Sequence, residues 1–158
     1  MIIEYEQQRY QTRVQEYQAQ KKICEETKPG SGIDPAELLK EVKKEEKRLA
    51  KMICKQEKVL FVAIHILMNV AEDLQIERKM KNRNIVKMLV DLIERNNPDL
   101  IYISLNFLKK LSVFGQNKND MVEYDIVKKI NRFIPCQNPL LTHIALRLLF
   151  NLSFDPEI

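Results

Sequence analysis

The sequence is poor in the residues that make turns. Its 158 residues contain only 3 Gly and 6 Pro, which excludes collagen-like chains, most low-complexity chains and a turn-rich all-β sandwich. Trp is absent, and no apolar run approaches the roughly 18 residues that a membrane span needs. The N-terminal MIIEYEQQRY lacks the basic start, apolar stretch and cleavage site of a secretory signal. We therefore expect neither a membrane span nor a secretory leader.

Cysteine is equally sparse. The 3 Cys are scattered along the chain and form no CxxC pair, so the sequence predicts neither a disulfide framework nor a zinc site. A reducing, cytosolic compartment is the simplest interpretation of this cysteine usage.

Charge of either sign is not concentrated in one half of the chain. The net charge of +4 comes from 26 basic and 22 acidic residues, and residues 1–58 and 59–158 each hold 13 basic and 11 acidic residues. Nucleic-acid binders usually gather positive charge on one face, so we expect no nucleic-acid partner. The densest basic patches, RKMKNR at 78–83 and KKEEKR at 43–48, adjoin Glu. This pattern favours a solvated helix face over an anionic docking site.

The first 57 residues predict a long, charged, antiparallel helical hairpin. Helices are expected over about 2–28 and 35–57, with a break at KPGSG, residues 28–32. The hairpin is either a projecting coiled coil that meets a partner or a solvated spacer packed on its own repeats. Half of a coiled-coil seam is carried by residues spaced seven apart: Ile3, Tyr10, Tyr17 and Cys24.

Residues 58–158 contain an internal repeat with a period of 41. NIVKMLVDLIERNNPDLIYISLNFLKKLSVF, from Asn84, aligns with DIVKKINRFIPCQNPLLTHIALRLLFNLSFD, from Asp125, and a third copy of the apolar pattern lies within LFVAIHILMNVAED. This period predicts an all-α solenoid of the armadillo or HEAT kind, with two full units after a leading third helix. The helices are expected at about 57–71, then 74–81, 85–96 and 98–114, then 116–123, 126–134 and 139–153.

No catalytic constellation is present. The sequence lacks the motifs GxxxxGK, GxGxxG, GxSxG and HExxH. Because His65 and His143 lie at different repeat positions, we expect them to be packed or rim residues. We expect no enzymatic activity, no metal and no cofactor.

Polar residues inside the apolar third helices are the candidates for binding a partner. In armadillo arrays these helices line a groove, where an Asn can hydrogen-bond the backbone of an extended peptide. For Asn69 and Asn151 a bond that buttresses the helix stack is an equal alternative, because an amide both donates and accepts. The absence of Trp from these positions disfavours an import-receptor role. Two equivalent repeat positions hold the six candidates: His65, Asn69, Asn106, Lys110, Arg147 and Asn151.

Three stretches of the repeat region resemble one family closely. NVAEDLQIERKMKNRNIVKMLV, FLKKLSVFGQNKNDMVEYDIVKKI and LRLLFNLSFD resemble the armadillo region of the kinesin-associated protein family, the non-motor accessory subunit of heterotrimeric kinesin-2. The close resemblance covers about residues 56–155, and residues 1–55 resemble the charged helical insertion that precedes these repeats more loosely.

The resemblance implies a non-enzymatic adaptor with protein partners. The family binds the tail region of the kinesin-2 motor chains and links the motor to cargo, including intraflagellar transport material. It implies a cytoplasmic, microtubule-associated location that extends to the cilium or flagellum. The alternative is a generic armadillo scaffold that binds a peptide unrelated to kinesin.

The resemblance also implies that the chain is a fragment, a truncated gene product or a divergent remnant of a longer array. No further unit follows the last third helix, so we expect self-association through its apolar side chains. These are Leu146, Leu148, Leu149, Phe150, Leu152 and Phe154.

Overall fold

The computed structural model describes residues 2–26 and 35–154, and all regular structure in these residues is helical. The predicted all-α class is therefore confirmed. The chain divides into two compact units, unit 1 (Met1–Val59) and unit 2 (Leu60–Ile158).

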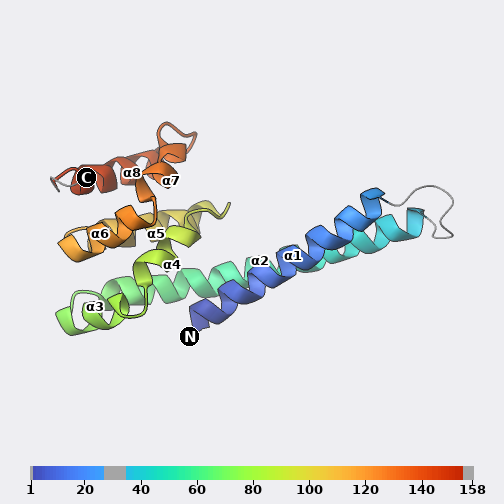
Figure 1. The fold of residues 1–158 in the computed structure, drawn as a ribbon, viewed down its shortest axis with the longest axis horizontal. Coiled ribbons are helices and arrows are strands. Elements are labelled where there is room, and N and C mark those ends of the chain that lie inside the picture. The colour runs from blue at the N-terminus through green and yellow to red at the C-terminus, as the bar shows by residue number, and fades with distance from the viewer. Residues whose placement is uncertain (1, 27–34, 155–158) are drawn as a thin grey trace. The chain divides into compact units, whose positions relative to one another are not determined.

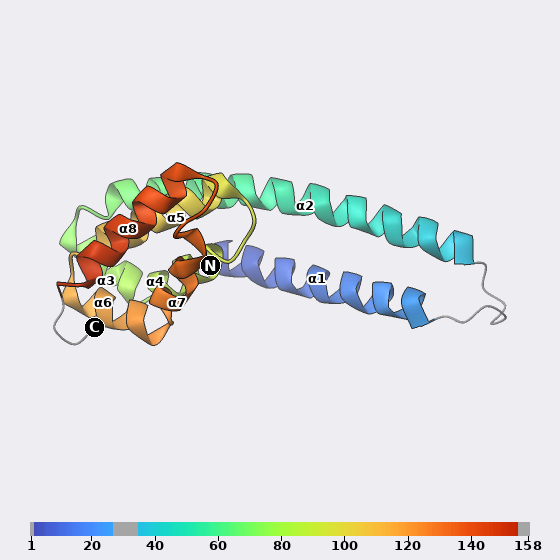
Figure 2. The same cartoon turned by 90° about the horizontal axis from the view of Figure 1, so that it is seen from above.

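Unit 1 contains α1 (Ile2–Glu26) and the first part of α2 (Pro35–Val70), which run in opposite directions (Figures 1 and 2). The turn predicted at residues 28–32 lies outside the described residues. On α1, Tyr17 of the predicted seam is half-buried, and so is Val14, which precedes it by three residues. The structure does not describe the side chains of the other seam residues, Ile3, Tyr10 and Cys24.

The second helix is longer than the sequence patterns suggest. We expected one helix over 35–57 and a separate leading third helix over 57–71, but α2 is continuous from Pro35 to Val70. The chain has no Gly or Pro between Pro35 and Pro98, so the change in apolar density near residue 58 meets no residue that stops a helix.

Unit 2 continues from Leu60 with six further α-helices and one 3₁₀ turn in its described residues. Two layers are visible in Figure 2, with the end of α2, α5 and α8 in one and the shorter helices in the other. The elements are α3 (Leu74–Lys81), α4 (Ile85–Leu92), α5 (Pro98–Leu111), α6 (Gly115–Glu123), α7 (Ile126–Ile130), η1 (Asn131–Phe133) and α8 (Pro139–Leu152).

The helix starts follow the local chemistry of the repeat. Asn97 precedes Pro98, and its Oδ1 accepts from the amides of Asp99 (3.0 Å) and Leu100 (3.2 Å). Asn138, 41 residues later, accepts from the Leu140 amide at 3.1 Å. An amide side chain at this position satisfies backbone N–H groups that the first helical turn leaves open, so Asn97 and Asn138 are the N-caps of α5 and α8.

The 41-residue period also governs backbone conformation. Asn84 (φ 53°) and Asp125 (φ 56°) precede α4 and α7 in the left-handed region. Asn and Asp adopt this region more readily than most side chains. The same unusual backbone state at equivalent positions shows that the repeat is structural as well as compositional.

Equivalent apolar positions form the core of unit 2. Each repeat buries the same register of side chains, which removes apolar surface from water and stabilises the stack. The buried pairs, each 41 apart, are Met80 and Met121, Ile85 and Ile126, Leu89 and Ile130, Leu100 and Leu141, Ile103 and Ile144, Phe107 and Leu148, and Leu111 and Leu152.

Polar contacts join the two repeats of unit 2. The buried Asn117 on α6 donates through Nδ2 to Glu77 Oε1 on α3 at 2.8 Å. Arg132 donates to the carbonyls of Ile93 and Arg95, the latter at 3.0 Å, and Lys129 pairs with Glu94 at 3.1 Å. Neighbouring repeats are therefore held by directed bonds as well as by the apolar core.

Candidate partner-binding groove

A hollow opens along the ends of the three long helices of unit 2. It has a volume of about 310 Å³, and we call it the groove. Four of the six predicted site residues line it together with three that the sequence did not single out. The lining residues are Met68, Asn69, Asn106, Lys109, Lys110, Val113 and Asn151.

Lys110 lines the groove and also ties α5 to the end of α2. Its ammonium donates to the Met68 carbonyl at 2.9 Å and pairs with Glu72 at 3.1 Å. The carbonyl near the end of a helix lacks an intrahelical donor, so this bond satisfies a group that the fold leaves open.

Asn151 makes the equivalent bond one repeat later. Its Nδ2 donates to the Lys109 carbonyl at 3.2 Å and to Ser112 Oγ at 2.9 Å. Lys109 and Asn151 lie 41 residues after Met68 and Lys110, so a Lys and an Asn perform the same task at the same register. In each case a side chain of one long helix reaches the last turn of the helix before it.

Asn69 and Asn106 differ from these two. Asn69 is exposed and Asn106 is half-buried, and neither makes a hydrogen bond within the described part of the chain. Each amide offers two donors and one acceptor oxygen, the complement of a peptide backbone. The groove therefore contains two tying residues, Lys110 and Asn151, and two residues whose amides face no internal partner.

The remaining candidates, His65 and Arg147, are exposed and do not line the groove. His65 lies one turn before Asn69 on α2, and its ring stacks on Phe61 with centroids 6.2 Å apart. Arg147 lies one turn before Asn151 on α8. Both occupy the same repeat position as Asn106, but of these three residues only Asn106 lines the groove.

Three lining residues were missed by sequence reasoning. Lys109 and Met68 contribute through carbonyls that accept the tying bonds, and carbonyl positions leave no signal in the type of side chain. Val113 is 73% exposed and lies beyond Leu111, where α5 ends, whereas the helix expected over 98–114 would have included it.

Within residues 2–26 and 35–154, no group of three or more His, Cys, Asp or Glu is arranged to hold a metal ion. No helix in the same residues has both the length and the apolar character to cross a bilayer.

Comparison with protein families places the chain in one of them. The family described as "Kinesin-associated protein (KAP)" matches residues 1–158, the whole chain. No solved structure matches the chain.

Proposed function

Because the chain belongs to the kinesin-associated protein family, we propose that it is a non-enzymatic adaptor that binds the tail region of the kinesin-2 motor chains. In this role it links the motor to cargo adaptors in microtubule-based and intraflagellar transport, in the cytoplasm and at the cilium. The observation that carries the proposal is the family match over the full length. This family consists of kinesin-associated accessory proteins and is not a known family of enzymes.

The groove is the proposed contact surface of an armadillo-type solenoid. Asn69 and Asn106 present amides that make no bond to described residues, and a peptide backbone in extended form offers matching donors and acceptors. Lys110 and Asn151 fix the spacing of the long helices, and His65 and Arg147 extend the contact along their row. The tail segment would bind by backbone recognition at the two free amides.

The test is direct binding of kinesin-2 tail fragments to the full chain, measured by calorimetry. Replacing both Asn69 and Asn106 by Ala should weaken binding by about tenfold or more, since each lost hydrogen bond contributes on the order of 1 kcal/mol. The matched control replaces Asn96 and Asn119, which are exposed and lie outside the groove.

The alternative, a generic armadillo scaffold, makes a different prediction in the same experiment. It would bind some unrelated extended peptide through Asn69 and Asn106 and would show no affinity for the motor tails. Equal losses in the groove variant and in the control would exclude the groove as the contact surface for either ligand.

The exposed face of α8 supports the proposal that the chain self-associates. Leu146 (49% exposed) and Phe150 (62%) lie one turn apart on α8, and Phe154 (68%) lies just beyond the end of that helix. The two Phe rings contact edge to face, with their centroids 4.8 Å apart. Burying such a stripe against a second copy would remove it from water. Sedimentation velocity should show the self-association weakened by Phe150→Glu and unchanged by Val113→Glu, which lies outside α8.

A further inference from the structure

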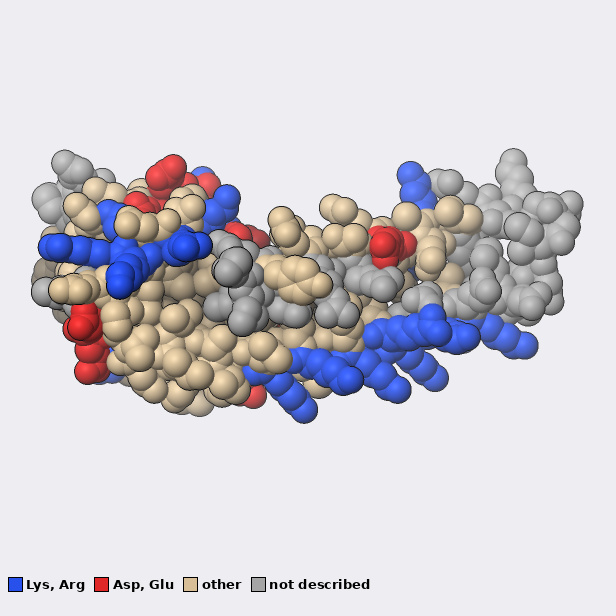
Figure 3. Space-filling model, turned by 90° about the horizontal axis from the view of Figure 1, so that it is seen from below, with Lys and Arg blue, Asp and Glu red and all other residues tan. Residues whose placement is uncertain are grey.

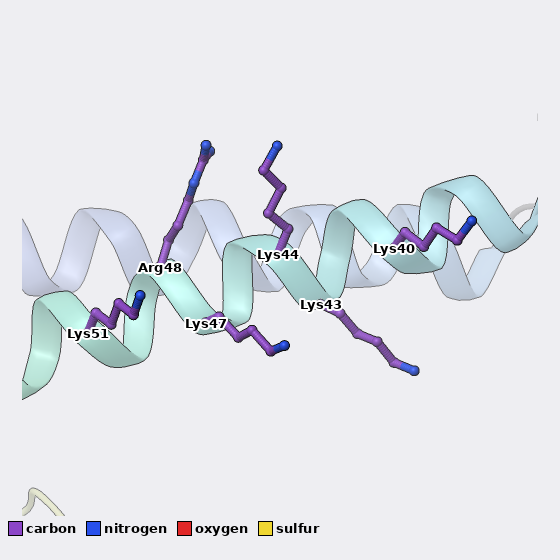
Figure 4. Close-up of a pocket in the computed structure, with 6 residues that line it drawn as sticks. All are labelled: Lys40, Lys43, Lys44, Lys47, Arg48 and Lys51. Carbon is purple, nitrogen blue, oxygen red and sulfur yellow. The ribbon is translucent and has the colours of Figure 1, made fainter.

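One side of α2 within unit 1 carries a continuous row of cations (Figure 3). Figure 4 shows Lys44 and Arg48 pointing one way from the helix and Lys43 and Lys47 the other way, with Lys40 and Lys51 between them. They lie at i, i+3, i+4, i+7, i+8 and i+11, the spacing that keeps residues on one side of an α-helix. We call this the basic face: Lys40, Lys43, Lys44, Lys47, Arg48 and Lys51. They line a shallow hollow of about 390 Å³.

The acidic side chains that the structure describes on this stretch of α2 do not pair with the lysines of the basic face. They are Glu46 and Glu57. Glu46 lies three residues after Lys43, within reach on the helix surface, but forms no ion pair with it. Within the described residues, the five lysines of the basic face form no ion pair or hydrogen bond.

The basic face also has no part in packing. All six of its residues are exposed, whereas Val42, Leu49 and Ile53 on the opposite side of α2 are half-buried. Like charges three and four residues apart destabilise a helix. In unit 2, by contrast, Lys110 and Lys129 are paired with Glu72 and Glu94. Five unneutralised lysines with no structural task indicate a surface that is completed by an external anion.

We propose that the basic face binds a Glu/Asp-rich segment of a partner polypeptide in extended form, separately from the groove of unit 2. Lys55 and Lys58 are exposed and continue the row, so the surface extends about 27 Å from Lys40 to Lys58 at 1.5 Å per residue. An extended acidic segment of about eight residues spans this length. Its carboxylates alternate along the chain, and mobile lysine side chains can follow them.

The composition of the basic face favours a polypeptide over the other polyanions. The sequence has no aromatic residue from Lys40 to Lys58, so nucleobases would find no stacking platform. A helix lying on a membrane needs large apolar side chains beside its cations, and Val42 and Leu49 face the opposite side.

The experiment uses the full chain and a fluorescent peptide of about ten glutamates, long enough to cover the basic face, with a glutamine peptide as the neutral probe. Binding is measured by anisotropy at about 50 mM salt, where surface charges are less screened than at physiological ionic strength. The test variant changes Lys40, Lys43, Lys47 and Lys51 to Gln. The control changes four exposed cations of unit 2, Arg78, Lys79, Arg83 and Lys87, to Gln, and has the same net charge.

The glutamate peptide should bind the unchanged chain and the control with affinities within about twofold of each other, and the test variant about tenfold more weakly. Circular dichroism should show equal helix content in all three proteins, because every changed side chain is exposed. Equal weakening in both variants would reduce the effect to net charge and overturn the proposal. It would also be overturned if the glutamate peptide failed to bind, or if a single-stranded oligonucleotide or vesicles containing phosphatidylserine bound the basic face in its place.

Discussion

Unit 1 and unit 2 are both helical, but their helices are stabilised in different ways. Every buried apolar side chain among the described residues belongs to unit 2, from Leu60 onward. The described residues of unit 1 bury one side chain, that of Gln56. Burial of apolar surface therefore explains the stability of unit 2, whereas the described side chains of unit 1 contribute little of it.

The difference between the two units follows the lengths of their helices. Helices of 25 and 36 residues, such as α1 and α2, exceed the roughly 12–15 residues below which isolated helices are marginal. They are rich in Glu, Lys, Gln and Arg, which favour helix formation. The helices that lie wholly in unit 2 have at most 14 residues and depend on their neighbours. The helices of unit 1 therefore depend less on packing than the short helices of unit 2, which must pack and form the groove by packing.

The same substitution in both units should show the difference most strongly. Leu108 is fully buried in α5 and Leu49 is half-buried in α2. Leu108→Ala should lower the free energy of unfolding by about 2–5 kcal/mol, because it leaves a cavity in a close-packed core. Leu49→Ala should cost about 1 kcal/mol or less. Urea unfolding followed by circular dichroism measures both losses. Similar losses of unfolding free energy would mean that apolar burial contributes as much to unit 1 as to unit 2.

The hydrogen bonds between repeats predict a second, smaller effect on stability, which is confined to unit 2. Asn117→Ala removes the donor at 2.8 Å from the buried Glu77 carboxylate. Leaving that group without its hydrogen bond should cost about 1–3 kcal/mol. Asn119→Ala, two residues away and exposed, should change stability by about 0.5 kcal/mol or less. Equal melting temperatures for the two variants would show that the tie between α3 and α6 contributes nothing.

The features that the sequence predicted correctly are local or periodic. Asn97-Pro98 and Asn138-Pro139 start α5 and α8 because cap chemistry depends only on adjacent residues. The apolar register repeats every 41 residues because each unit buries the same face. The separate helices expected over 35–57 and 57–71 were wrong, because a change in composition is not a helix stop and α2 continues through residue 58.

The groove and the basic face could be predicted only in part, since both depend on neighbours. Asn69 and Asn151 are both asparagines at the same repeat position. Among the two, only the Asn151 side chain donates hydrogen bonds within the described residues, to the Lys109 carbonyl and to Ser112 Oγ. Lys110 makes the matching bond although it is a different residue type. Residues 1–58 and 59–158 hold equal numbers of basic and of acidic residues, so a count of charges does not reveal the basic face. Only the helical register brings Lys40, Lys44 and Lys47 to one side of α2.

Within unit 2, Asn151 and Asn69 should separate stability from binding. Asn151→Ala removes bonds to the Lys109 carbonyl and Ser112 and should lower the unfolding free energy by about 1 kcal/mol. Asn69→Ala should leave it unchanged within about 0.5 kcal/mol while weakening a ligand in the groove. Chemical denaturation measures the first effect and calorimetry the second. Equal stability losses would show that Asn69 also buttresses the stack.

Removing a whole helix from unit 1 should have the smallest effect on the stability of unit 2. Deleting residues 1–34 removes α1 and leaves α2 in place. The core from Leu60 onward loses no buried apolar side chain that the structure describes, so amide hydrogen exchange in α5 and α8 should keep the same protection. Protection in α2 before Val59 should fall, because Leu49 and Ile53 are half-buried in unit 1 and lose any cover that α1 gives them. If α5 instead exchanged faster after the deletion, the two units would share one cooperative fold, and the contrast between them would be one of composition alone.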